Sequence, residues 1–213
     1  MSLIFHTRSS ASESQRPTLS PLHGLLPNSF HAPRSLPTGM VTLLLADIEG
    51  STRLWETVPE VMAAALRHMD RVLNELVPAH HGVFPLEQGE GDSFVVAFAR
   101  VGDAVACALA LQQAALAPLR LRIGVHTGDV QLRDEAKYMG PTVNRAARLR
   151  DLGHGGQTLL SGMTSYLARE LLPARTWLLD LGRYALRGMS MPEQVAQLSH
   201  PDLRTYFPPL RSN

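Results

Sequence analysis

Val-Thr-Leu-Leu-Leu-Ala-Asp-Ile-Glu-Gly-Ser-Thr-Arg-Leu-Trp, residues 41–55, is the segment around which the rest of the chain is organised. Its first six residues form a short apolar run of the length of a buried strand. The run stops at Asp47, and Gly50, Ser51 and Thr52 are typical of a tight turn that leads into a helix. The sequence therefore predicts a carboxylate at a strand end, facing the free backbone N–H groups of a helix N-terminus.

This arrangement has the groups that nucleotide chemistry needs. A carboxylate can hold a cation, and the amides at the positive end of a helix dipole can hold phosphate. On this stretch alone, an equally good interpretation is that Asp47 simply opens a turn. The choice between the two depends on residues elsewhere in the chain.

Size and composition indicate a globular protein. The chain has 213 residues, of which 45% are hydrophobic and 18% are charged, and its formal net charge is +1. So small a net charge gives no general case for binding nucleic acid or an anionic membrane. The single cysteine, Cys107, lies in an alanine-rich apolar pattern, and we expect it to be a small core residue of a reducing, cytoplasmic protein.

Three segments are expected along the chain. Residues 1–39 are serine-rich, carry five prolines and show no periodic apolar face, so we expect a flexible extension. This extension lacks the continuous apolar core of a signal peptide, and nothing in the chain approaches a membrane span. Residues 40–199 form the predicted folded domain, and residues 200–213 form an extended, proline-bearing tail.

Apolar periodicity divides the domain into strands and helices. After a helical region that follows Asp47, a stripe at helical spacing runs from Met62 to Leu76 behind Pro59, which suits the first position of a helix. Further helices are expected at 104–116, 140–149 and 164–172, further strands at 83–86, 93–98, 121–128, 155–161, 177–181 and 194–198, and a short excursion at 129–137. This order, βαββαβ with additional units, predicts an α+β fold with helices packed on a mostly antiparallel sheet.

A predicted hairpin places a second carboxylate near the first. Residues 87–92, Glu-Gln-Gly-Glu-Gly-Asp, lie between two predicted strands and suit a hairpin turn. Asp92 follows Asp47 by 45 residues, the distance at which one strand–helix–hairpin unit brings two strand ends side by side. The glycines form no dinucleotide fingerprint, because no helix follows and the third glycine is missing. Asp92 also fits a role as a turn residue only.

Other polar residues are less specific. Asn144 and Arg148 are four apart and share one helix face, where an amide could orient a sugar and a guanidinium could neutralise a phosphoryl oxygen. Taken alone, a solvated helix face is the simpler interpretation. Four histidines show no metal-ligand spacing and are expected to be surface or turn residues: His80, His81, His126 and His154. Their spacing disfavours a metal hydrolase.

Five stretches in order resemble the catalytic domain of class III adenylyl/guanylyl (nucleotidyl) cyclases. They are residues 47–52 (Asp-Ile-Glu-Gly-Ser-Thr), 91–92 (Gly-Asp), 122–128 (Arg-Ile-Gly-Val-His-Thr-Gly), 143–148 (Val-Asn-Arg-Ala-Ala-Arg) and 186–189 (Leu-Arg-Gly-Met). The resemblance covers residues 40–199 and implies a ferredoxin-like core that works as a head-to-tail homodimer. The tail is similar to the linker that, in one bacterial subgroup, joins such a domain to an ATPase module and a LuxR-type DNA-binding domain.

The resemblance implies two shared active sites at the dimer interface. One subunit would supply Asp47, Asp92 and the carbonyl of Ile48 to two magnesium or manganese ions. The amides at the start of the first helix would hold the triphosphate with the help of Arg122. Those amides belong to Gly50, Ser51 and Thr52.

The other subunit would supply the remaining groups. Asn144 would place the ribose, Arg148 would stabilise the transition state, and Arg187 would grip the terminal phosphates. The implied reaction converts ATP to cyclic AMP and pyrophosphate by in-line attack of the ribose 3′-hydroxyl on the α-phosphorus. The expected partners are a nucleoside triphosphate and a second copy of the chain, without nucleic acid or membrane.

Two positions depart from the family pattern. Active adenylyl cyclases usually read the purine with a lysine and an aspartate, and the matching residues here are Gln88 and Lys137. The departure predicts slow turnover and weak base selectivity. It leaves two alternatives: a cyclase that uses GTP, and a degenerate domain that serves as a regulatory dimerisation or nucleotide-sensing module.

Overall fold

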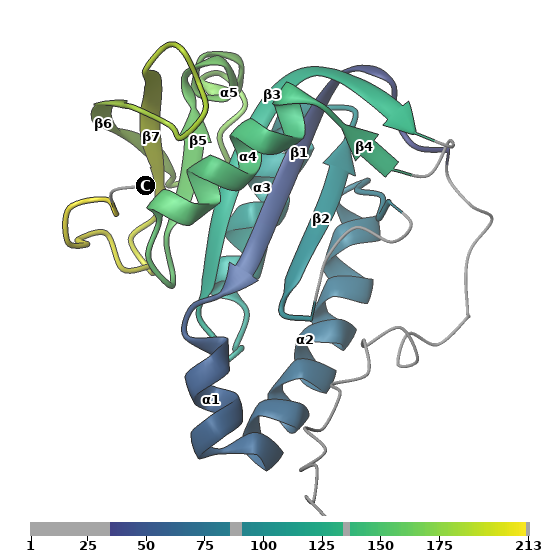
Figure 1. Ribbon diagram of the computed structural model, residues 1–213, viewed down its shortest axis with the longest axis vertical. Helices are drawn as coiled ribbons and strands as arrows, with labels where there is room; N and C mark the ends of the chain where they lie inside the picture. Colours follow the sequence, from purple (N-terminus) through teal and green to yellow (C-terminus); the bar gives the residue numbers. More distant parts are fainter. Residues whose placement is uncertain (1–34, 86–90, 134–136, 212–213) are drawn as a thin grey trace, which may run out of the picture.

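Strand β1 (Gly39–Ile48) lies inside the sheet (Figure 1). The computed structural model describes residues 35–85, 91–133 and 137–211. Strands β2 (Ser93–Phe98) and β3 (Leu121–Arg133) flank β1, and both run antiparallel to it. The apolar run that predicted β1 is buried from Val41 to Ile48, because helices cover both faces of the strand.

The other strands extend the sheet on the far side of β3. The described strands form one sheet in the order β2-β1-β3-β5-β7-β6, and β4 pairs with the outer part of β3. Strands β3 and β5 pair in parallel, whereas the other neighbours are antiparallel. The bounds of these strands are β4 Lys137–Met139, β5 Thr158–Ser161, β6 Trp177–Tyr184 and β7 Glu193–Ser199. The predicted α+β fold with a mostly antiparallel sheet is confirmed.

Helices lie on both faces of the sheet. Helices α2 (Pro59–Ala79), α3 (Val101–Gln113) and α5 (Gly162–Ala168) share the larger core cluster with one face. Helix α4 (Pro141–Leu152) crosses the opposite face, over β1 and β3 (Figure 1). Cys107 is buried in α3 as expected, and burial raises the pKa of its thiol to about 12. No helix in the described part of the chain is both long and apolar enough to cross a bilayer.

Several predicted elements differ from the structure. In the described part of the strand expected at 83–86, residues 83–85, there is one antiparallel bridge, between Val83 and Ala97, and Leu86 lies outside the described residues. Residues 129–133 continue β3 and pair with β4, where we expected a short excursion. Strand β5 begins at Thr158, since a turn with Gly156 at φ 90° precedes it.

Candidate functional site

Two carboxylate residues meet where β1 and β2 adjoin. The Cα partners of Asp47 are Ser93 on one side and Arg122 on the other. The backbone N–H of Ile48 donates to the carbonyl oxygen of Asp92 at 3.2 Å. Asp47, which precedes Ile48, and Asp92 therefore lie at the same edge of the sheet. The prediction that these two strand ends lie side by side is confirmed.

Asp47 is held by two arginines. The Arg122 guanidinium donates from Nε to Oδ1 at 2.7 Å and from Nη2 to Oδ2 at 2.5 Å. The Nε of Arg150, on α4, lies 3.3 Å from the same Oδ2. The Asp47 side chain is only 11% exposed, so these charges are partly shielded from water.

The charge of Arg122 is stabilised by its surroundings. Burial disfavours the charged guanidinium, but the hydrogen bond and charge of Asp47 outweigh it, with help from Asp151 and Glu49, and raise the pKa of Arg122. The residue predicted to hold a triphosphate therefore pairs with the predicted cation ligand in this structure. Asp47 near the end of β1 and Arg122 near the start of β3 are neighbours at one edge of the sheet.

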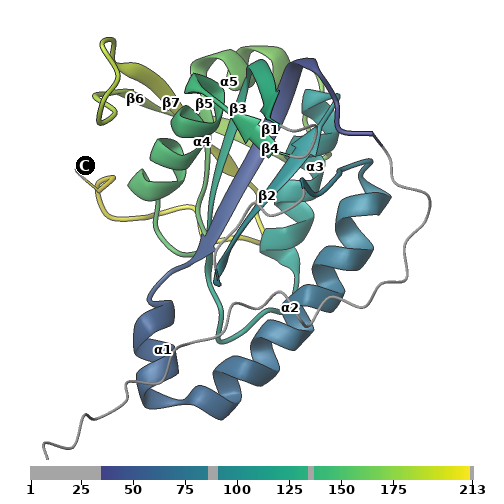
Figure 2. The ribbon, with the colours of Figure 1, turned by 45° about the vertical axis from the view of Figure 1, so that its right-hand side comes forward.

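The turn after β1 leads into helix α1 (Ser51–Thr57), which lies beyond the end of the strand beside α2 (Figure 2). Gly50 has φ 69°, a left-handed conformation that side chains rarely adopt, so glycine is needed there. No side chain caps α1. Its first-turn N–H groups, which include those of Ser51 and Thr52, are therefore not taken by a capping side chain.

Glu49 was not predicted as a site residue, yet it anchors this turn. Its carboxylate contacts Arg120 at 2.7 Å and also accepts from Arg211, near the end of the chain. Burial raises its pKa, but a hydrogen bond from the Gly155 backbone and the charges of Arg120, Arg211 and His154 outweigh burial and lower it. Glu49 therefore stays charged and fixes the backbone next to Ile48.

Helix α4 presents different residues to its two sides. Arg150 points toward β1, whereas Asn144 is exposed and Arg148 is 38% exposed with its Nη1 3.7 Å from Asp151 Oδ2. At 100° per residue, positions 144 and 148 share a face that is opposite to positions 146 and 150. The structure therefore does not direct Asn144 and Arg148 at the Asp47 of their own chain.

Arg187 lies in the connection between β6 and β7. Its neighbour Leu186 is buried in a cluster with Leu149 and Leu152 of α4. An ion pair of 2.8 Å between Arg145 and Glu193 also ties α4 to the start of β7. The connection that carries Arg187 is thus fastened to α4.

Gln88 and Lys137 are the residues predicted to read the purine base. Gln88 lies outside the described residues, so its predicted contact with the purine stays a prediction. Lys137 begins β4, opposite Arg133 of β3.

A comparison with protein families matches residues 34–198 to the adenylate and guanylate cyclase catalytic domain. The chain belongs to this family. Uncharacterized proteins of Mycobacterium bovis and Mycobacterium tuberculosis are 61% identical over 176 residues, which is 83% of this chain. The chain spans about 61% of the length of these curated relatives.

Relatives with a described activity are more distant. A receptor-type adenylate cyclase of Trypanosoma equiperdum is 30% identical and matches 87% of this chain and 49% of its own length. Among solved structures, an adenylate cyclase of Trypanosoma brucei in its monomeric state superposes with a TM-score of 0.70, at 27% identity over 84% of this chain and 95% of that one. The adenylyl cyclase CyaB of Pseudomonas aeruginosa, at 24% identity, has the same fold, with a TM-score of 0.64 and coverage of 78% and 97%.

The residues predicted to bind a cation are oxygen donors. The described residues contain no group of three or more histidine, cysteine or acidic side chains placed to hold a metal. Asp47, Asp92 and a backbone carbonyl are nevertheless the ligand types that magnesium prefers, with its other positions filled by water or phosphate. Arg122 and Arg150 already contact both oxygens of Asp47, so a cation bound there would have to displace at least one of these contacts.

One histidine prediction is wrong. His126 is buried in β3, where its Nδ1 lies 2.7 Å from Ser161 Oγ, because this strand is covered on both faces. Burial and the nearby charge of Arg145 lower the pKa of His126 to about 4. A buried, neutral, hydrogen-bonded histidine is a core residue of the cyclase domain.

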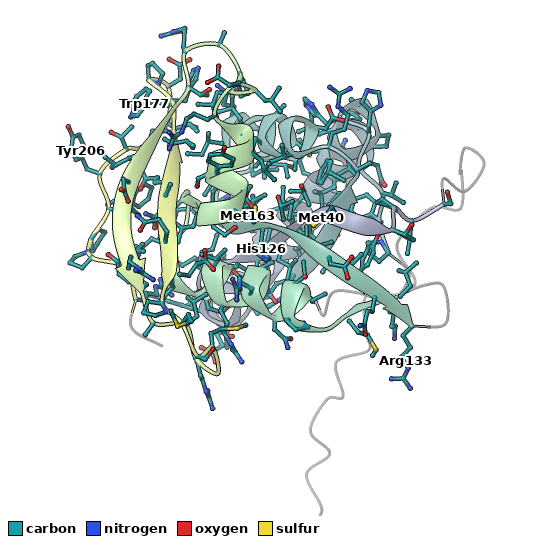
Figure 3. The ribbon with its side chains drawn as sticks, turned by 90° about the horizontal axis from the view of Figure 1, so that it is seen from above. Met40, His126, Arg133, Met163, Trp177 and Tyr206 are labelled. Atoms are coloured by element: carbon teal, nitrogen blue, oxygen red, sulfur yellow. The ribbon has the colours of Figure 1, made fainter. Side chains whose placement is uncertain are left out.

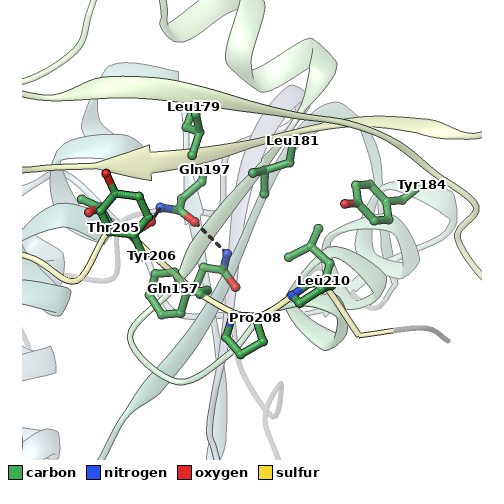
Figure 4. A pocket seen from close by; sticks show the side chains of 11 residues that line it. Gln157, Leu179, Leu181, Tyr184, Gln197, Thr205, Tyr206, Pro208 and Leu210 are labelled. Carbon is green, nitrogen blue, oxygen red and sulfur yellow. Dashed lines mark hydrogen bonds between the residues drawn. The ribbon is translucent and has the colours of Figure 1, made fainter.

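A small cavity of about 280 Å³ lies elsewhere, between β6 and residues 205–210 (Figure 4). Gln157 and Gln197 form its polar floor, joined by a hydrogen bond of 2.8 Å, and Gln197 also donates to the carbonyl of Thr205. Trp177 and Tyr206 are exposed on this same side of the domain, well apart from His126 (Figure 3). None of the candidate site residues lines this cavity.

Proposed function

We propose that this chain is a purine nucleotide cyclase that converts ATP to cyclic AMP and pyrophosphate at sites shared between two copies. The observation that carries the proposal is the division of the candidate residues. Asp47 and Asp92 share one sheet edge, while Asn144 and Arg148 lie on the face of α4 that points away from the sheet. Family membership supports the chemistry, and a second copy would bring the two halves together.

In the first half, Asp47, Asp92 and the carbonyl of Ile48 would hold two magnesium or manganese ions. Such ions lower the pKa of the ribose 3′-hydroxyl and neutralise charge on the phosphates. The first-turn amides of α1 would bind the triphosphate, together with Arg122 once it turns from Asp47. Glu49 would keep that turn in place through Arg120 and Arg211.

In the second half, Asn144 would orient the ribose so that its 3′-oxygen faces the α-phosphorus. A bond forms between these two atoms, the bond from the α-phosphorus to the bridging oxygen breaks, and pyrophosphate leaves. Arg148 would stabilise the charge that develops on the phosphoryl oxygens, and Arg187 would bind the terminal phosphates. These groups would come from the partner copy, because α4 directs them away from their own strand end.

The choice of base is part of the proposal. Lys137 only donates hydrogen bonds, so it suits the guanine oxygen better than the adenine amino group, and a cyclase that uses GTP is the close alternative. A second candidate is a regulatory dimerisation or nucleotide-sensing module without useful turnover. The pairing of Asp47 with two arginines favours the regulatory module, because the arginines would compete with a cation for the Asp47 carboxylate.

A manganese-supplemented assay for cyclic nucleotide and pyrophosphate, with ATP and GTP in parallel, tests the proposal. Wild type should form both products, and Asp47→Ala or Asp92→Ala should abolish them without unfolding the dimer. Wild-type activity in Asp47→Ala would contradict the assignment of the cation site. Nucleotide binding without any turnover would favour the sensing module.

A further inference from the structure

Arg150 lies between two carboxylates that belong to different parts of the site. Its Nε is 3.3 Å from Asp47 Oδ2, and its Nε and Nη2 are 3.1 Å and 2.7 Å from Asp151 Oδ1. The other oxygen of Asp151 faces Arg148 at 3.7 Å. Four charged side chains therefore run without a break from Asp47, the candidate cation ligand, to Arg148, on the opposite face of α4.

The two arginines on Asp47 are not equivalent. Arg122 makes a two-pronged contact at 2.5 Å and 2.7 Å, whereas Arg150 makes one contact at 3.3 Å. A divalent cation on Asp47 would add two positive charges beside both guanidiniums. Arg150 has the weaker contact and a second carboxylate to move to, so it is the group that should yield.

Asp151 determines what happens when Arg150 yields. Its carboxylate is shared between Arg150 and Arg148. If Arg150 loses Asp47, its whole charge is left to Asp151, and the longer contact to Arg148 is the one that weakens. Arg148 would then be free to turn to a phosphoryl oxygen.

We propose that Arg150 is a positioning residue that gives up Asp47 to a divalent cation and, by pairing with Asp151 alone, releases Arg148. This inference rests on the proposed function, because it takes Asp47 as a cation ligand and Arg148 as a residue offered to the other copy. Cation binding at one site thereby frees Arg148 of the same chain, which would serve the second site. The two sites of a dimer are coupled through one turn of α4.

Binding of Mn²⁺ to the full chain without nucleotide, followed by electron paramagnetic resonance, tests the competition directly. Arg150→Gln should tighten Mn²⁺ binding about two- to fivefold, the range expected for a partly exposed ion pair. Asp151→Asn should weaken it by a similar factor, since Arg150 then pairs more fully with Asp47. Arg67→Gln, on an exposed position of α2, makes the same charge change as Arg150→Gln and should leave the affinity unchanged.

The double variant separates competition from general electrostatics. If Asp151 acts through Arg150, Asp151→Asn should have no effect on Mn²⁺ affinity once Arg150→Gln is present. An equal weakening in both backgrounds would overturn the proposal. Should Arg150→Gln fail to fold, Arg150→Lys keeps the charge without the forked geometry. Its Mn²⁺ affinity should lie between that of wild type and that predicted for Arg150→Gln. Wild-type affinity in Arg150→Lys would overturn the proposal.

Coupling between the sites has its own measurement. With 3′-deoxy-ATP, which lacks the attacking hydroxyl, Mn²⁺ titration of the wild-type dimer should give a higher Hill coefficient than that of Arg150→Gln, in which only cooperativity between the two ions of one site remains. Non-cooperative binding in wild type would overturn the coupling. If Asp47→Ala does not change Mn²⁺ binding, the proposed function fails; if binding needs Asp47 but ignores Arg150, the role of Arg150 alone fails.

Discussion

Replacing Gly124 by alanine should push helix α4 away from the sheet. A Cβ atom on Gly124 would lie 2.5 Å from the carbonyl oxygen of Ala146, 2.5 Å from the backbone nitrogen of Arg150 and 3.0 Å from its Cα. These are backbone atoms of a helix, so no side chain can turn aside to make room. Either α4 moves as a unit or β3 bends.

The expected cost follows from this overlap. Overpacking a well-packed core costs about 1–3 kcal/mol, and for a domain of this size each kcal/mol lowers the melting temperature by about 2–4 °C. The melting temperature should therefore fall by roughly 2–12 °C. Because α4 carries Asn144 and Arg148, and a misplacement of about 1 Å can cost a hundredfold in rate, cyclase activity should fall more than the folded fraction does.

Gly102→Ala is the matched control. Its Cβ would lie 3.4 Å from Leu171 Cβ, an ordinary contact, and the position is inside α3, where alanine is favoured by about 0.4–1 kcal/mol. Thermal unfolding and cyclic nucleotide formation, both measured well below the melting range, compare the two variants. A wild-type melting temperature for Gly124→Ala would refute the packing argument, and a lower melting temperature with full activity would refute the link between α4 and catalysis.

Three further predictions address the shared site, the base and pH. Asp47→Ala and Arg148→Ala should each be nearly inactive but regain part of the activity when mixed, since one site of the heterodimer is intact; no recovery after confirmed subunit exchange rules out a split site. Lys137→Asp should shift kcat/KM toward ATP over GTP by about 1–3 kcal/mol, and an unchanged ratio means that Lys137 points away from the base. Because the folded state holds the pKa of His126 near 4, the unfolded state takes up the proton first as pH falls below 6.5. Wild type should therefore lose about 2 kcal/mol of unfolding free energy between pH 7.5 and 5 in denaturant titrations, a loss that His126→Gln should not show.

The arrangement of the sheet could be predicted because local patterns determine it. The apolar run at 41–46 became the buried part of β1, and the spacing of Asp47 and Asp92 followed from one strand–helix–hairpin unit. Of the strand expected at 83–86, the described residues 83–85 pair with β2 only through Val83, and Phe84 stays exposed, so the apolar run here did not specify a regular strand. His126 was misassigned because a strand buried on both faces has no alternation to reveal it.

The pairings around the site could not be predicted, because they depend on tertiary packing. Arg150 reaches Asp47 only because Gly124 lets α4 approach β3, and no local pattern shows which turn of a helix faces a strand. Arg211 reaches Glu49 across 162 residues of sequence. An arginine on the inward side of an otherwise apolar helix face is the one signal that could have singled out Arg150.

The C-terminal residues fasten the turn after β1, and this can be tested. The backbone N–H of Arg211 donates to the carbonyl of Leu152 at 2.9 Å, His154 Nε2 lies 3.0 Å from the carbonyl of Pro209, and Leu210 packs against the cluster below α4. The Arg211 guanidinium therefore reaches Glu49 from a fixed backbone. Removing that guanidinium should loosen the turn after β1 more than it destabilises the fold.

Arg211→Gln is the variant that tests this. The Arg211 side chain is 39% exposed, so its ion pair is worth no more than about 1 kcal/mol, and the melting temperature should fall by less than about 4 °C. Hydrogen exchange of the Glu49 amide, which donates to the Arg120 carbonyl at 3.0 Å, should nevertheless quicken, and KM for the nucleotide should rise more than kcat falls. Lowering the pH should have the same effect in wild type: the pKa of Glu49 is depressed in the folded state, so its pairing is complete above pH 4.5 and is lost as pH falls through the folded value.

Arg204→Gln provides the control within the same segment. Arg204 donates to the carbonyl of Tyr206 and lies 4.7 Å over the Phe207 ring, and it makes no ion pair with Glu49 among the described residues. It should change the mobility of residues 204–207 and leave exchange at the turn unaltered. If both variants quicken exchange of the Glu49 amide equally, the effect comes from loosening the whole segment. If neither does, Arg120 and the Gly155 backbone hold Glu49 without help. Only a response confined to Arg211→Gln shows that the end of the chain fixes the turn through this ion pair.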